Sequence, residues 1–429
     1  MAAPNNILQT VQTYQKAELA WLLNSFCAIS LANKKFKDFN NLTANLGDTV
    51  TFDLPPRYVT YNGLVITQQQ SAQRVQSLVC SQAANTSAAY TDQQFIFNVR
   101  DYMDRFGMAA MKELGSTIEA DILRNAVSGV RVNDPQNANF GSLQTTSGPY
   151  RFYGDGVTPI NSYGQLAKAL ANFRDFGAAP NKTRGFIPMA NVPDIINTGL
   201  NQFAMNRNNE IANSWELGNF SDCEWYQSNL LPTHISGNVG INGTTLTFVS
   251  INAAGDSIVF SGAAASDASA ILAGDLLQFQ DGVSGKPNMR FLTFIGHNPT
   301  QQPVQFRATA DVASTAGGQV TIPISPALLA GSSENANLNN VLQAGMQAKA
   351  LPSHRAGLIY SGDQFYLAMP QLPDQAPYTT VNMMDKDSGA SIRHYYGSQF
   401  GQNVRSYVRD SIWGSALTID NSMRLIFPL

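Results

Sequence analysis

A block of short β-rich segments between His234 and Leu351 constrains the fold more than any other feature of this sequence. The sequence on both sides mixes helical and extended patterns. Strand-length segments separated by turn residues are typical of a small all-β barrel or sandwich. The predicted strands are Leu246–Ile251, Asp256–Ser261, Leu276–Gln280, Arg290–Ile295, Val304–Ala308 and Gln319–Ile324. We therefore predict an all-β domain inserted into a surface loop of an α+β host.

The chain carries unusually little charge. Charged residues make up 13% of its 429 residues, whereas soluble domains average about 25%. Asn and Gln together outnumber Asp, Glu, Lys and Arg. Protein–protein contacts are poor in charge because removing water from a charge is costly. Two interpretations stay open: neighbouring molecules cover this neutral surface, or the composition reflects a general compositional bias of the source organism.

The charge balance also bears on partners. A net charge of −3 opposes a nucleic-acid-binding surface, which needs a basic excess. The densest basic cluster is Lys34, Lys35 and Lys37. It favours a solvated helix end, and a contact with an acidic partner or nucleic acid is the alternative.

No motif for catalysis, cofactor binding or metal binding is present. The sequence has no phosphate-binding glycine loop and no nucleophile elbow. Cys27, Cys80 and Cys223 fit no metal or redox spacing, so we predict reduced, buried thiols. The histidines, which fit no ligand pattern, are His234, His297, His354 and His394. We predict a non-enzymatic protein with no catalytic, cofactor-binding or metal-binding residues.

No signal peptide begins the chain, and no run of about 18 apolar residues could span a membrane. We therefore expect the protein to be made and folded in a cytoplasm.

The flanking segments predict a mixed α and β host. Residues Asn6–Ala32 have the spacing of an amphipathic helix. Thr49–Leu54 and Val75–Cys80 predict a two-stranded arm with a polar tip, and Asp92–Ser128 predicts a long helix. Further predicted elements are helices near Ser162–Phe176 and Asn191–Thr198, strands at Thr183–Met189, Glu224–Ser228 and Ala356–Tyr360, a helix start at Gly362–Phe365, and extended stretches at Ser391–Tyr396, Asn403–Val408 and Arg424–Phe427.

Several stretches resemble the major capsid (coat) proteins of tailed bacteriophages. The matching stretches are Glu216–Phe220, Ser228–His234, Ala273–Phe279, Phe306–Asp311, Val320–Pro326 and Ala356–Met369, with a looser pattern at Gly389–Arg393, Arg405–Asp410 and Gly414. Their order and spacing cover about residues 45–429. The chain most resembles short-tailed-phage coat proteins, which carry an inserted β-barrel domain on the shell fold first described for a Hong Kong phage.

This resemblance implies an α+β capsid fold with six parts. They are an N-terminal arm at 1–45, an extended β-arm loop at 46–90, a peripheral domain with a long spine helix at 91–160, the first part of an axial domain at 161–233, the inserted β-barrel at 234–351, and the axial and peripheral return at 352–429. In this family the insertion aids folding and braces subunits within a capsomer.

The resemblance also implies function and partners. The chain would self-assemble as pentamers and hexamers into an icosahedral head that encloses double-stranded phage DNA without reading its sequence. Scaffolding and portal proteins would be partners, with no cofactor and no membrane. Assembly would take place in the bacterial cytoplasm, and the product would be part of the virion. An alternative is a phage tail or receptor-binding structural protein with a β-sandwich binding module; a β-rich hydrolase would need a convergent acidic or histidine pocket.

The arm departs from relatives that crosslink their shells through a lysine on this loop. No lysine occurs between Lys37 and Lys112, so we predict a non-covalent shell. We assign Arg57, Tyr58 and Tyr61 as intersubunit anchors, since Arg and aromatic residues dominate interface hot spots. The alternative is that these three are ordinary exposed loop residues.

Overall fold

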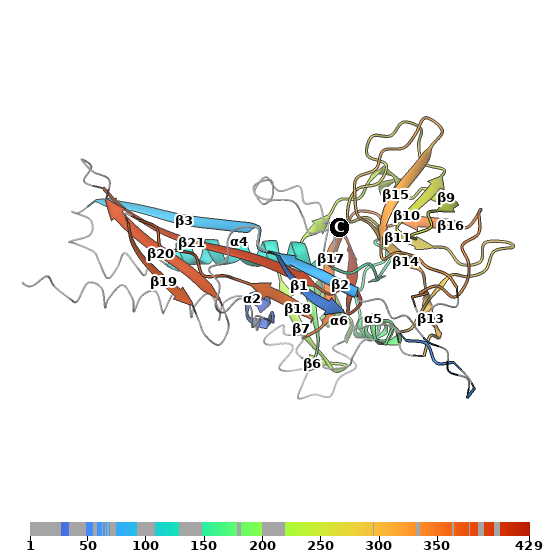
Figure 1. Ribbon diagram of the computed structural model, residues 1–429, viewed down its shortest axis with the longest axis horizontal. Coiled ribbons are helices and arrows are strands. Elements are labelled where there is room, and N and C mark those ends of the chain that lie inside the picture. The colour runs from blue at the N-terminus through green and yellow to red at the C-terminus, as the bar shows by residue number, and fades with distance from the viewer. Residues whose placement is uncertain are drawn as a thin grey trace, which may run out of the picture.

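The computed structural model describes residues 27–33, 49–54, 58–61, 63–64, 66, 68, 74–91, 108–127, 148–177, 182–199, 219–294, 296–331, 335–362, 364–376, 378–384, 390–398 and 404–429. The molecule is elongated (Figure 1). A long sheet with a helix beside it forms one end, a mixed sheet lies in the middle, and a barrel forms the other end. Most of the predicted N-terminal helix, the Lys34–Lys37 cluster, Arg57 and residues 92–107 of the predicted long helix lie outside the described residues.

The β-rich block folds into a closed six-stranded barrel in the order β10-β15-β14-β11-β16-β9. Its strands are β9 (Thr245–Ile251), β10 (Ser257–Ser261), β11 (Leu276–Phe279), β14 (Gln305–Ala308), β15 (Gln319–Ser325) and β16 (Gln347–Ala350), and β12 (Arg290–Leu292) pairs with β13 (Pro299–Pro303) beside it. Alternate side chains fill the interior, where Phe248, Phe260, Phe279 and Phe306 lie with neighbouring ring centroids 5.5–6.3 Å apart. Barrel closure leaves no free strand edge. Five of the predicted strands are confirmed in the barrel, and the predicted strand Arg290–Ile295 is confirmed over Arg290–Leu292, outside the barrel.

The central sheet has the order β4-β22-β17-β5-β7-β6, with β8 also pairing with β17. Its strands are β4 (Phe152–Tyr153), β5 (Thr183–Pro188), β6 (Asn219–Phe220), β7 (Cys223–Ser228), β8 (Thr233–His234), β17 (His354–Ser361) and β22 (Ser422–Pro428). Strands β17 and β22 are mostly buried on both faces, as expected for interior strands.

Helices cover one face of this sheet. Helix α5 (Tyr163–Asp175) begins at Ser162, whose side chain accepts a hydrogen bond from the Gln165 amide and so caps the helix. Its apolar stripe packs with helix α6 (Val192–Gly199), which follows the short 3₁₀ turn η3 (Met189–Asn191), on the same core as β5 and β22. The predicted helices and strands of this region are confirmed.

The long sheet joins β18 (Phe365–Ala368), β21 (Val404–Leu417), β20 (Ser391–Ser398) and β19 (Thr379–Met384), and β3 (Gln82–Thr91) also pairs with β21. Helix α4 (Met108–Val127) lies along it (Figure 1). Its residues Met111, Leu114, Ile118 and Ile122 recur at helical spacing and are buried in one core. Short helix α2 (Cys27–Leu31) docks on α4.

The predicted helix start at Gly362–Phe365 is wrong. The chain turns at Gly362, whose amide donates to the carbonyl of Lys182, and then enters strand β18. Phe365 pairs with Leu417 and Ala368 with Gly414 of β21. Phe365, Leu367 and Ala368 are buried and Tyr366 is partly exposed, so the pairing with β21 identifies this segment as a strand.

The predicted two-stranded arm is confirmed. Strand β1 (Thr49–Leu54) pairs antiparallel with β2 (Arg74–Val79), from Thr49 opposite Val79 to Leu54 opposite Arg74. The loop between these strands runs away from the body, toward the lower right of Figure 1. Along the described stretches of the chain, no helix is long and apolar enough to cross a lipid bilayer.

Candidate assembly surface and barrel junction

The loop between β1 and β2 exposes large apolar side chains. Tyr58 is 60% exposed and Tyr61 41%, while Leu64 is 103% and Ile66 89% exposed. Arg57, the third predicted anchor, lies outside the described residues. Leu64 and Ile66 were not predicted as contact residues, although two apolar residues within a Gln-rich stretch could have indicated them. Exposed apolar residues gathered on one projecting segment indicate a contact surface.

The other unusual region is the junction between the barrel and the central sheet. The chain enters the barrel after β8 and returns on β17, where His354 lies opposite His234. Both imidazoles are buried, with ring centroids 5.2 Å apart. These two histidines are far apart in the sequence, and the pairing of β8 with β17 brings them together. The segment that contains the barrel therefore begins and ends at neighbouring positions of one sheet.

Asp275 ties the barrel to the entry segment. Its Oδ1 lies 2.7 Å from Nε2 of His234, and its Oδ2 accepts hydrogen bonds from the amides of Gly237 at 3.0 Å and Leu272 at 2.8 Å. Three partners satisfy this buried carboxylate, as a buried charge requires. On the return segment, Nδ1 of His354 donates to the carbonyl of Pro352 at 2.8 Å. Burial, with the nearby His234 and Arg424, lowers the pKa of His354 well below its ordinary 6.5.

Two buried arginines cross the junction. Arg424 of β22 donates from Nη1 to the carbonyl of Gly274 at 3.3 Å and from Nη2 to the carbonyl of Val127 at 2.6 Å. Arg307 of β14 donates to the carbonyl of Gly148 at 3.2 Å. Burial lowers the pKa of Arg424 to about 9, where the charge of Arg307 acts in the same direction and Asp275 opposes it. Burial also lowers the pKa of Arg307 to about 10.

A buried glutamine and an apolar layer complete the contact. The side-chain amide of Gln305 accepts from the amide of Phe152 at 2.9 Å and donates to its carbonyl at 3.0 Å. It thereby pairs with β4 as a neighbouring strand would. Phe152 also packs with Leu276, Leu351 and Ile426. Barrel and sheet are therefore joined by directional polar contacts as well as by apolar packing.

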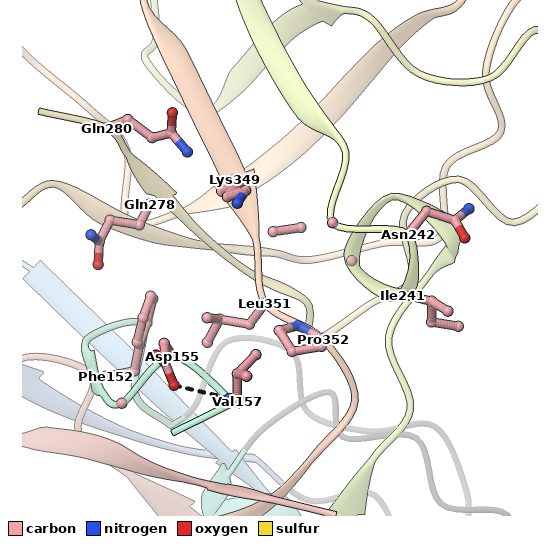
Figure 2. A pocket seen from close by; sticks show the side chains of 14 residues that line it. Phe152, Asp155, Val157, Ile241, Asn242, Gln278, Gln280, Lys349, Leu351 and Pro352 are labelled. Carbon is pink, nitrogen blue, oxygen red and sulfur yellow. Dashed lines mark hydrogen bonds between the residues drawn. The ribbon is translucent and has the colours of Figure 1, made fainter. Parts of the chain in front are cut away.

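A cavity of about 560 Å³ opens beside this junction (Figure 2). Phe152, Val157, Ile241, Leu351 and Pro352 supply its apolar wall. Its charged lining residues are Asp155 and Lys349. The Asp155 carboxylate is hydrogen-bonded within its own turn, where Oδ1 accepts from the amides of Val157 at 2.9 Å and Thr158 at 2.7 Å. Its lining presents no pair of carboxylates and no histidine for acid–base chemistry.

Cys80 and Cys223 are buried, as predicted, and burial raises the pKa of the Cys223 thiol. The side chain of Cys27 lies outside the described residues. In the described part of the chain, no three His, Cys, Asp or Glu side chains gather closely enough to hold a metal ion.

No family model and no curated protein matches the sequence. Solved structures do match it over most of its length. The capsid of Ralstonia phage GP4 has 8% identity and a TM-score of 0.44, covering 94% of this chain and 88% of that chain. A structure of Mycobacterium phage Che8 has 8% identity and a TM-score of 0.43, covering 93% and 90%. The capsid of the cyanophage P-SCSP1u has 10% identity and a TM-score of 0.39, covering 92% and 89%.

Proposed function

We propose that this chain is a major capsid protein that self-assembles into the icosahedral head of a tailed bacteriophage. The observation that carries the proposal is the projecting β1–β2 loop, with Leu64 and Ile66 almost fully exposed. A subunit gains nothing from displaying such side chains to water, whereas an assembled wall covers them. The ordered succession of capsid-like sequence stretches supports the same function.

The parts of the fold take capsid roles in this proposal. The β1–β2 arm is the extended loop that lies over a neighbouring subunit. Helix α4 is the spine helix of a peripheral domain built on the long sheet, and the central sheet with α5 and α6 is the axial domain. The barrel is the inserted domain, and the six parts keep the bounds predicted from the sequence. Arg57, Tyr58 and Tyr61 act as intersubunit anchors, together with Leu64 and Ile66.

Copies of the chain are its principal partners, arranged as pentamers and hexamers. Scaffolding and portal proteins take part in assembly, which occurs in the cytoplasm of the bacterial host. The finished head encloses double-stranded DNA without sequence readout. The net charge of −3 supports this role, because an inner surface that bound DNA tightly would need a basic excess.

Expression of the chain in bacteria, alone and with its phage's scaffolding protein, tests the proposal. Electron microscopy of the purified product is expected to show closed spherical shells with icosahedral symmetry. Rods, or discrete trimers that never close, would contradict it and favour a tail or receptor-binding protein.

A further inference from the structure

We infer that Arg424 is a positioning residue that locks the inserted barrel to the spine helix α4 in one orientation. The inference rests on the proposed function in one respect, because that orientation then sets the curvature with which copies assemble. The locking itself is a property of the single subunit.

The position of Arg424 in the fold is the first ground. Its side chain leaves the central sheet from β22 and reaches two other units, since Val127 is the last described residue of α4 and Gly274 lies in the turn that precedes barrel strand β11. Arg424 thus donates a hydrogen bond to α4 and another to the barrel from one side chain.

The kind of contact is the second ground. Apolar packing at this junction, between Phe152, Leu276, Leu351 and Ile426, resists separation but has little directional preference. A planar guanidinium with two hydrogen bonds to different units restricts rotation as well as distance. Among the contacts described above, this side chain alone reaches both α4 and the barrel.

Charge balance is the third ground. Arg424 and Arg307 are both buried and repel each other, whereas Asp275 attracts Arg424. Asp275 is itself held by His234 and by the amides of Gly237 and Leu272. Replacing Arg424 with a neutral residue therefore removes a counter-charge of Asp275 as well as two hydrogen bonds. The two residues should act as a coupled pair rather than independently.

Calorimetry of unassembled, full-length subunits tests the lock without requiring a shell. The wild type is expected to unfold in one transition, because buried polar contacts couple host and barrel; two transitions in the wild type would overturn the inference. Arg424→Gln should split this into two transitions, and Arg424→Lys should restore part of the coupling. A cycle of Arg424→Gln and Asp275→Asn should show non-additivity of roughly tenfold in the unfolding equilibrium constant. A single transition in Arg424→Gln, or additive effects, would overturn the inference.

The matched control is Arg124→Gln. Arg124 is also a buried arginine, but it pairs with Asp121 of the same helix at 2.5 Å. Its loss should lower the midpoint without splitting the transition. In assembly, Arg424→Gln should give shells of irregular diameter, and any shells of Arg124→Gln should keep the wild-type diameter. Uniform wild-type-sized shells from Arg424→Gln would refute the effect on curvature. If the wild type forms no shells, the proposed function fails while the calorimetry still decides the lock.

Discussion

Replacing both Leu64 and Ile66 with serine tests whether the β1–β2 loop is an assembly surface or an ordinary exposed loop. Both side chains are almost fully exposed in the single subunit. The substitutions therefore remove no packing from it, and the melting temperature of unassembled protein should stay at the wild-type value. Any loss must appear in the association of copies.

The size of that loss follows from burial. Covering one leucine or isoleucine completely contributes about 1.5–3 kcal/mol, so the two side chains contribute about 3–6 kcal/mol per loop. Each 1.4 kcal/mol corresponds to roughly tenfold in an association constant. The double substitution should thus weaken the contact made by each loop by a factor of roughly 10² to 10⁴.

Light scattering against protein concentration measures this effect as the threshold at which shells appear. The control is Val341→Ser, which changes an apolar side chain that is also well exposed but lies on a barrel loop outside the arm. It should leave the threshold near the wild-type value. An unchanged threshold in the arm variant would show that Leu64 and Ile66 stay in water in the assembled state, and the proposed role of the loop would be wrong.

Three further predictions concern the subunit and the shell. Burial, with the charge of Arg409, lowers the pKa of His394 to about 3. The stability contributed by the neutral imidazole is therefore complete above about pH 6.5 and is lost as the pH falls, by about 2 kcal/mol at pH 5. Urea midpoints at pH 7 and pH 5 should differ less in His394→Gln than in the wild type. A Cβ on Gly185 would lie 2.3 Å from Cζ3 of Trp225, so Gly185→Ala should destabilise the subunit by about 1–3 kcal/mol in denaturant titrations. As its control, Gly164→Ala should be neutral or stabilising, because a Cβ there would lie 4.0 Å from Ser162 Oγ, an ordinary contact distance. Denaturing gels of assembled shells should show only the monomer band, because the arm has no lysine; a ladder of covalent multimers would contradict this.

The barrel was predictable because its strands follow local rules. In β15, for example, Val320, Ile322 and Ile324 alternate with more exposed residues, and this period is visible in the sequence. Strand β16 was not visible, because its residues Gln347–Ala350 have no strand preference. It is a strand only because β9 and β11 pair with it on both sides.

The two features that matter most for the proposals depended on contacts distant in sequence. Arg424 was predicted to lie in an extended segment, but nothing local indicates that its partners are Val127 and Gly274, 297 and 150 residues away. The wrong helix start at Gly362–Phe365 has the same origin. A short stretch with Gly and Asp fits a helix cap as well as a turn, and only the pairing of β18 with β21 decides.

For the proposed capsid role, the way in which the barrel is attached favours a brace over a tethered module. Because His234 and His354 are paired neighbours, the host sheet can accept an insertion at this point with little disturbance. Two adjacent connections alone would act as a hinge, about which the barrel could swing. Gln305, Arg307 and Arg424 each add a buried polar contact between the barrel and the rest of the protein, away from this hinge line. In the proposed capsid, such contacts suit a barrel that must hold its angle against neighbouring subunits, whereas a module that only displayed a binding face would gain nothing from them.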